Sequence, residues 1–161
     1  MTTDQWLFAL ILVAALGCGL VAGVFFAFSA FVMKALARLP SAAGISAMQS
    51  INIVVLNPWF LGAFFGTAAA CLVALVISLF RWHEPGAVYL LAGSVLYLAG
   101  TLMVTIVCNV PRNEALASLA PADRDAASRW AQYVAGWTAW NHVRTAAALT
   151  AAGSFTAALG S

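Results

Sequence analysis

Three long stretches of the sequence carry no formal charge, and this feature restricts the possible folds more than any other. They are Trp6–Met33, Pro58–Phe80 and Gly86–Cys108. A helix needs about 20 apolar residues to cross a hydrocarbon core roughly 30 Å thick. Each stretch therefore has the length and composition of a membrane-spanning helix, and the sequence predicts an integral membrane protein.

The overall composition agrees with this class and narrows the partners. Hydrophobic residues make up 64% of the 161 residues and charged residues 7%, whereas soluble domains carry about 25% charged residues. With a formal net charge of +2 and no run of basic residues, the chain lacks the positive surface that nucleic acid binding requires. We expect one transmembrane domain over residues 1–161, embedded in the lipid bilayer. The first stretch is longer than the apolar core of a signal peptide, so we expect it to remain as a helix.

A fourth span is predicted from the position of Arg144. The following segment, Thr145–Ser161, is rich in Ala and Thr, and as a helix it reaches only about 25 Å. A full crossing must therefore begin before Arg144, which puts the guanidinium inside the membrane or at its boundary. The expected spans are residues 6–33, 58–80, 86–108 and 137–158.

The connections between the spans predict how the helices are arranged. The first, Pro40–Asn57, opens with a Pro-Ser helix start and has apolar side chains at helical spacing. In the third, Val110–Gly136, Pro121 and Asp123 can begin another helix, and the second connection is only a turn. Short connections join antiparallel neighbours. The prediction is an all-α, integral membrane four-helix bundle with up-down-up-down topology and short interfacial helices in the first and third connections.

Small residues indicate where helices approach one another in lipid. Gly19 and Gly23, like Gly62 and Gly66, have the G-x-x-x-G spacing. We expect them to pack within the molecule, and an oligomer formed through these glycine-rich faces is the alternative. The cysteines lack the spacing of a disulfide framework or a metal site. They are expected as small buried side chains: Cys18, Cys71 and Cys108.

The distribution of Lys and Arg predicts the orientation of the chain. Cytoplasmic loops of membrane proteins are enriched in these residues. We therefore expect both long connections in the cytoplasm and both termini outside it, in a bacterial inner membrane. The second connection holds one basic residue, Arg81, and the first and third hold Lys34, Arg38, Arg112, Arg124 and Arg129.

Polar side chains gather at membrane depth near one end of the predicted bundle. Asn109 and Asn113 lie four residues apart, and they share a helical face if the helix continues past Pro111, which can kink it. On the returning segment, one stripe at helical spacing mixes aromatic rings with hydrogen-bonding groups, which suits a flat, partly polar organic molecule. Its members are Trp130, Tyr133, Trp137, Trp140, Asn141 and Arg144.

These residues also have structural interpretations. Aromatic residues anchor helices at membrane interfaces, and Arg144 can pair with Glu114 or donate to the two amides. His142 points about 100° away from Asn141, and it is a candidate proton shuttle, a haem ligand or a hydrogen-bonded structural residue. The histidines and carboxylates lack the spacing of a metal site, so no metal is predicted.

Five short segments carry a family resemblance: GVFFAFSAFVM at 23–33, MQSIN at 48–52, NPWF at 57–60, NVPRNEAL at 109–116 and WTAWNHVRT at 137–145. Together they resemble the anthrone oxygenase-like family of small four-helix membrane proteins. The resemblance implies oxygenation of anthrones to anthraquinones, associated with some members, without a conventional cofactor. The chain departs from the family pattern at Lys34 and Arg112, which add positive charge. The family-typical positions are Ser29, Met48, Gln49, Asn52, Asn57, Pro58, Asn109, Pro111, Asn113, Trp137, Trp140, Asn141 and Arg144.

These observations lead to one main functional hypothesis, an oxygenase acting on an anthrone- or phenol-like aromatic. The deprotonated substrate reacts with O₂ directly, so the protein needs a base, donors that stabilise the anion and a dry pocket. No cofactor is predicted; a non-enzymatic membrane protein that binds a quinone, haem or lipid, or a partner subunit, is the alternative. The candidate base is His142, the oxyanion donors are Arg144, Asn141, Asn109 and Asn113, and the substrate-binding residues are Trp137, Trp140, Trp130, Tyr133, Gln49, Asn52, Asn57 and Ser29.

Overall fold

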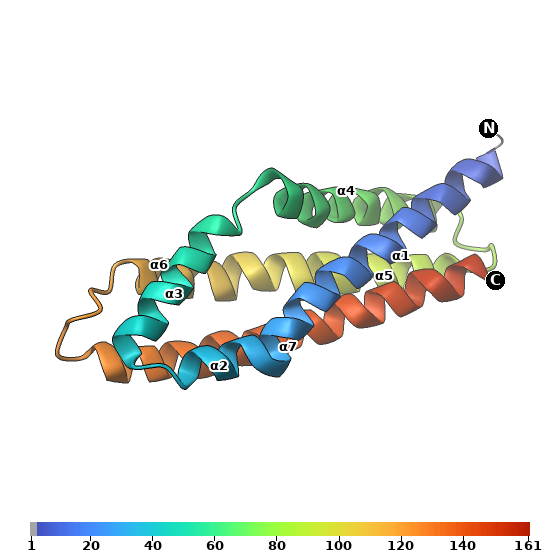
Figure 1. Ribbon diagram of the computed structural model, residues 1–161. Helices are drawn as coiled ribbons and strands as arrows, with labels where there is room; N and C mark the ends of the chain where they lie inside the picture. Colours follow the sequence, from blue (N-terminus) through green and yellow to red (C-terminus); the bar gives the residue numbers. More distant parts are fainter. Residues whose placement is uncertain (1–2) are drawn as a thin grey trace.

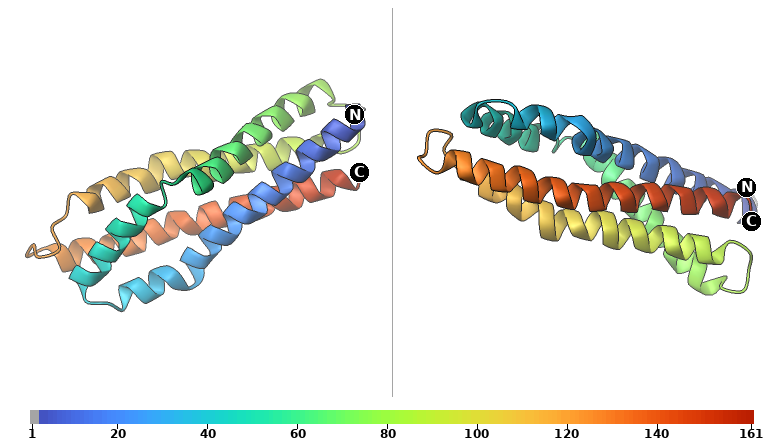
Figure 2. Two further views of the ribbon diagram at one scale, coloured as in Figure 1. Left: turned by 45° about the horizontal axis from the view of Figure 1, so that its top comes forward. Right: turned by 90° about the horizontal axis from the view of Figure 1, so that it is seen from below.

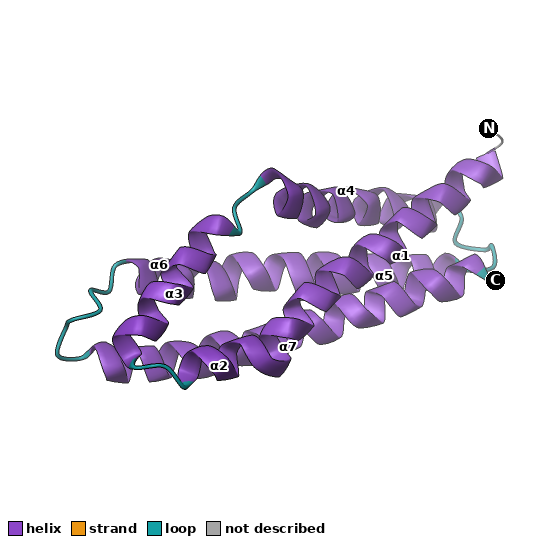
Figure 3. Cartoon of the chain, viewed as in Figure 1, coloured by secondary structure: helices purple, strands orange, loops and turns teal. Residues whose placement is uncertain are grey.

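The computed structural model describes residues 3–161, and every regular element in that part of the chain is helical (Figures 1 and 3). The all-α prediction is therefore confirmed. Residues 1–2 of the predicted domain lie outside the described part. The elements are α1 (Thr3–Ala27), the π-helical η1 (Phe28–Val32), α2 (Met33–Ala37), α3 (Ser41–Val54), α4 (Pro58–Phe80), α5 (Ala87–Val95), the π-helical η2 (Leu96–Met103) and η3 (Thr105–Asn109), α6 (Val110–Ala117) and α7 (Ala126–Leu159).

Consecutive elements join into long helices that pack side by side. α1 lies against α4 and α7, and α5 lies against the same two helices. α1 begins and α7 ends at the same end of the molecule, and α2, α3 and α6 lie at the other end (Figure 2). Three helices are long and apolar enough to cross a membrane, namely Asp4–Ala37, Pro58–Phe80 and Ala87–Ala117. The chain is thus an integral membrane protein. α7 is also long, but it is less apolar than these three helices.

α4 has the boundaries that its sequence predicts. Asn57 caps its first turn by accepting hydrogen bonds from the backbone N–H groups of Trp59 and Phe60, at 3.1 and 3.0 Å. Pro58 follows at the position where a missing N–H costs nothing. Its 23 residues give a length of about 35 Å. Trp59 lies in its first turn and Trp82 lies just after its last residue, and both are exposed. Exposed tryptophans at the two ends of a span are typical of the two membrane interfaces.

The two long connections differ in structure. The helix predicted in the first connection is confirmed as α3, which spans Ser41–Val54. The prediction of a separate short helix in the third connection is wrong. α6 continues the third long helix to Ala117, and the segment after Asp125 belongs to α7. Only residues 118–125 remain as a loop, because both helices extend past their apolar segments.

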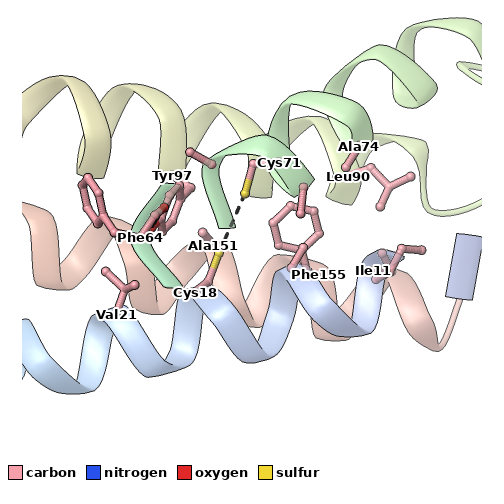
Figure 4. Packing of buried hydrophobic residues seen from close by; sticks show 14 of the residues in the cluster. Ile11, Cys18, Val21, Phe64, Cys71, Ala74, Leu90, Tyr97, Ala151 and Phe155 are labelled. Carbon is pink, nitrogen blue, oxygen red and sulfur yellow. Dashed lines mark hydrogen bonds between the residues drawn. The ribbon is translucent and has the colours of Figure 1, made fainter. Parts of the chain in front are cut away.

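The main core lies where α1, α4, α5, η2 and α7 meet (Figure 4). Cys18 and Cys71 are fully buried there, with their sulfur atoms 4.0 Å apart. The Tyr97 hydroxyl donates to the Phe64 carbonyl at 3.0 Å, which satisfies a polar group in an apolar environment. Burial is confirmed for these two cysteines, whereas Cys108 is only partly buried.

The G-x-x-x-G pairs do not make the intramolecular contacts that the sequence predicted. A Cβ atom added at any of their glycines would have no neighbour within 4 Å. Close helix approach occurs instead at Gly100, where an added Cβ would lie 2.6 Å from the Ala147 Cβ, and at Gly44, where it would lie 2.9 Å from the Trp130 ring. An oligomer through the unoccupied glycine faces stays a prediction. Those faces contain Gly19, Gly23, Gly62 and Gly66.

The two kinds of glycine predict different responses to the same substitution. Gly100→Ala forces η2 and α7 apart, and we expect it to lower the free energy of unfolding by about 1–3 kcal/mol. Gly62→Ala is the matched control, because its new methyl group meets open space. Thermal unfolding of both variants in detergent, followed by circular dichroism, measures the difference. Equal midpoints would show that α7 and η2 are not in close contact at Gly100.

Candidate functional site

Arg144 is the centre of the polar cluster. Its side chain points into the bundle and is 4% exposed. Nη2 donates to Asn141 Oδ1 at 2.6 Å, and Nη1 donates to Thr105 Oγ1 at 3.2 Å. The guanidinium carbon lies 4.1 Å from the centre of the Phe25 ring and 5.1 Å from that of Trp137. Neutral dipoles and aromatic faces therefore surround this cation.

No carboxylate neutralises Arg144 within residues 3–161. The one ion pair in that range joins Arg81 to Glu84, in the turn at the opposite end of the molecule. The proposed pairing of Arg144 with Glu114 is therefore not formed, and neither is donation to Asn109 or Asn113. Arg144 Nε is also buried without a hydrogen-bond partner. An unneutralised buried cation is costly, so the site favours an anionic ligand.

Asn141 fixes the guanidinium in place. Its Nδ2 donates to the Phe25 carbonyl and to Ser29 Oγ, each at 2.7 Å, while its Oδ1 accepts from Arg144. Thr145 Oγ1 donates back to the Asn141 carbonyl at 2.8 Å. Asn141 thus joins α7 to the junction of α1 and η1, and both N–H groups of its side chain are used within the protein. Its role in the structure is to position Arg144.

The three π-helical segments all lie beside this cluster. In η1 the N–H of Met33 bonds to the carbonyl of Phe28, five residues back, and in η3 the N–H of Val110 bonds to that of Thr105. Wide turns of this kind are often found at functional sites. Ser29, the Arg144 partner Thr105 and Asn109 belong to these turns.

Asn109 and Asn113 have separate partners. Asn109 is buried, and its Nδ2 donates to the Trp137 carbonyl at 3.2 Å. Asn113 Oδ1 accepts from the Tyr133 hydroxyl at 3.0 Å. The helix does continue past Pro111, through α6. Burial raises the pKa of the Tyr133 phenol, so this group stays protonated and acts as a donor rather than a base.

The aromatic stripe on α7 borders the site at Trp137. The rings of Trp130, Tyr133 and Trp137 stack in sequence, with centroids 5.6 and 6.4 Å apart. Trp137 Nε1 is buried and has no acceptor. Trp140 does not belong to the stripe, because it is 37% exposed on the outer surface of α7. At this level of α7 the side chain that points into the bundle is that of Asn141, not that of Trp140.

A cavity of about 560 Å³ lies in front of Arg144, within the usual range for small-molecule sites. Its walls come from α1, η1, α3, α4, η3, α6 and α7, and most of them are apolar. Arg144 lies near Phe25, and Phe25 contacts Phe64. Phe64 lies on α4, roughly 9 Å along the helix from Pro58. The polar groups of the cavity wall are Gln49, Asn52, Thr105, Asn113, Glu114, Trp137 and Arg144.

Several predicted site residues do not line this cavity. Asn57 is the cap of α4, and Ser29, Asn109 and Asn141 support the wall from behind. Trp130 and Tyr133 belong to the second apolar core, with Ile45 and Met48 among others. Lys34 and Arg112, the two departures from the family pattern, are also absent from the lining. Arg112 Nη1 donates to the Cys108 carbonyl instead.

The structure does not support His142 as the catalytic base. Its side chain is exposed on the outer face of α7, away from the cavity. One residue along a helix turns the side chain by about 100°, so the burial of Asn141 directs His142 outward. Thr105 and Phe25 were not among the site residues predicted from the sequence. Thr101, Thr105 and Asn109 repeat every four residues, a signal that could have revealed Thr105, whereas Phe25 has no such signal.

The comparisons with known proteins agree with the family resemblance. A family model described as anthrone oxygenase matches residues 59–154, which is more than half of the chain. No curated protein sequence and no solved structure was found to match the chain. The chain belongs to the anthrone oxygenase family. The matched segment includes Arg144, Asn141 and Thr105.

The role of Asn141 is testable through folding. We expect Asn141→Ala to lower the free energy of unfolding by about 2–3 kcal/mol, because it leaves Arg144, Ser29 and the Phe25 carbonyl each short of a partner. Val143→Ala, two residues along on the exposed face, is the control and should have little effect. Chemical unfolding in a mild detergent gives both values. A loss no larger than that of the control would contradict the positioning role.

Proposed function

We propose that this member of the anthrone oxygenase family oxygenates an electron-rich aromatic, of the anthrone or phenol type, with O₂ and without a conventional cofactor. One observation carries the proposal. The cavity ends at a buried guanidinium that no carboxylate of residues 3–161 neutralises. Two N–H groups there, Arg144 Nε and Trp137 Nε1, lack acceptors. An aromatic oxyanion supplies both the missing charge and the missing acceptor.

The chemistry follows from stabilising that oxyanion. An anthrone loses a proton from its methylene carbon, and the electron pair moves onto the carbonyl oxygen beside Arg144. The methylene carbon then transfers electrons to O₂ and forms a C–O bond, and the resulting peroxide takes up a proton. Loss of the second proton from that carbon breaks the O–O bond, releases water and leaves a second carbonyl. One anthrone and one O₂ give one anthraquinone and one water.

The proton leaves through the polar side of the cavity. Among the described lining residues, Glu114 is the one carboxylate, and it is exposed at the end nearest α3 and α6. We assign Glu114 the relay of the proton to solvent, in place of His142. Most of the remaining wall is apolar and excludes water from the anion, which strengthens its interaction with Arg144.

Oxygen uptake with dithranol tests the proposal. Arg144→Gln removes the charge that stabilises the anion, and we expect kcat to fall by about 10²–10³-fold. Asn141→Asp keeps the side-chain shape but places a carboxylate on Arg144 Nη2, so it should lose activity while staying folded. His142→Ala is the matched control from the outer face and should equal wild type. An oxygen electrode measures all four proteins against empty nanodiscs, and Arg144→Gln at full activity would refute the proposed role.

A non-enzymatic quinone-binding protein is the second candidate. A quinone carbonyl is an acceptor for Arg144 Nε and Trp137 Nε1, and no histidine lines the cavity among the described residues. The organic extract and absorption spectrum of gently purified protein separate the two functions. Quinone in the extract together with no oxygen uptake favours binding, and a Soret band would identify haem instead.

We also propose that the protein crosses the membrane four times, with α7 as the fourth span over residues 137–158. α7 packs along both α1 and α5, and its 34 residues reach about 51 Å. The basic residues lie mainly at the α2–α3–α6 end, so the positive-inside rule places that end in the cytoplasm of a bacterial inner membrane.

Fusions to alkaline phosphatase, which is active only outside the cytoplasm, test this orientation. A fusion after Ser161 should be active, because the C-terminus is proposed to lie outside. A fusion after Ala120, in the loop between α6 and α7, should be inactive. The reverse pattern would invert the orientation, and equal activity at the two positions would rule out α7 as a span.

A further inference from the structure

The cavity wall is incomplete on one side. Several residues that line it are also exposed on the outer surface of the molecule. Ile53 is 72% exposed and Leu56 66%, at the junction of α3 and α4. Phe65, on α4, is 53% exposed, and Ile106, on η3, is 48% exposed. These side chains are all apolar, so the opening between them faces the hydrocarbon rather than water.

The position of the opening follows from how α4 packs. α4 contacts α5 and η2, and the cavity begins where the neighbouring helix continues into η3. Phe65 lies roughly 10 Å along α4 from Pro58. The gap is therefore inside the membrane, beneath the interface that Trp59 indicates.

The opposite end of the cavity is held closed. Gln49 on α3 donates to the carbonyls of Leu116 and Leu119, at 2.9 and 3.0 Å. These two bonds tie α3 to the end of α6 and the loop that follows it. The cavity residues at this end, Glu114 and Ala117, are exposed, but the passage beside them is bridged by a side chain with two hydrogen bonds.

We infer that the cavity opens sideways into the bilayer between α4 and η3, and that it takes amphipathic phenol-type molecules from the lipid phase and binds them as anions. The anionic oxygen lies at Arg144, and the opposite edge of the ring faces the gap bounded by Phe65 and Ile106. A hydrophobic chain on that edge extends into the lipid. This inference deepens the proposed function, because it orients the reacting carbon of an anthrone toward the side from which O₂, itself concentrated in hydrocarbon, arrives.

Two nitrophenols of different chain length test the orientation directly. In 4-butyl-2-nitrophenol and 4-dodecyl-2-nitrophenol the chain lies opposite the oxygen, and the phenolate absorbs visible light. Wild-type protein in phosphatidylcholine nanodiscs should ionise both probes more than empty nanodiscs do, with the dodecyl probe bound at least as tightly as the butyl probe. Arg144→Gln should abolish the excess phenolate. An enclosed cavity would instead weaken the dodecyl probe by at least about tenfold.

Bulky substitutions test the route. Ile106→Trp fills the opening, and we expect it to slow association of the dodecyl probe by about tenfold or more. Val107→Trp is the matched control, since Val107 is exposed but does not line the cavity. Ala117→Trp obstructs the opposite end, and it should slow association of the dodecyl probe less than Ile106→Trp does. Slowing by Ala117→Trp rather than Ile106→Trp, or no excess ionisation of either probe by wild type, would overturn the inference.

These readouts do not depend on turnover. If dithranol drives no oxygen uptake but both nitrophenols bind with the expected pattern, the oxygenase proposal fails and the lipid-side opening stands. If dithranol is oxidised while Ile106→Trp and wild type bind the dodecyl probe at equal rates, the oxygenase proposal stands and the opening is refuted.

Discussion

The arrangement of the polar end of this protein depends on one buried guanidinium. No carboxylate of residues 3–161 forms an ion pair with Arg144. A single buried charge costs several kcal/mol unless polar groups surround it. The partners it does have come from three separate helices: the Phe25 ring from α1, Thr105 from η3, and Asn141 from α7. The cation therefore fixes the relative positions of these helices while its charge stays unneutralised.

Local chain geometry creates the space in front of that charge. The wide turns η1 and η3 bring Ser29 and Thr105 toward α7. Asn57 ends α3 and starts α4 in a new direction, while Gln49 holds α3 against α6. Because α4 is directed away from η3 at this level, the helices cannot fill the volume between them. The cavity is thus a consequence of caps and turns placed in the sequence, with Arg144 at its inner end.

Hydropathy and helix caps were enough to predict the helical fold, and they fail where the sequence becomes polar. Residues 58–80 coincide with α4, because an Asn-Pro cap and an uncharged stretch define the same limits. The start of α7 was taken for a separate short helix beginning near Pro121 and Asp123, since helices that extend beyond an apolar segment lose the signal that identified them. Within the site, helical spacing correctly paired Trp137 with Arg144. The same spacing wrongly included Trp140, which is exposed. His142 was chosen as the base for its chemistry, although the spacing already directed it about 100° away from Asn141.

A cation facing an apolar chamber has a chemical advantage for reactions of O₂ with organic anions. In the proposed function, the neutral aromatic enters from the lipid without losing hydration, and it becomes an anion only where Arg144 stabilises the charge. Water that would solvate the anion is excluded by side chains such as Phe25, Phe28 and Phe64, so the electrostatic interaction is stronger than in solution. The anion in turn relieves the cost of the buried cation. Ligand binding and folding stability are coupled through the same charge pair in this proposal.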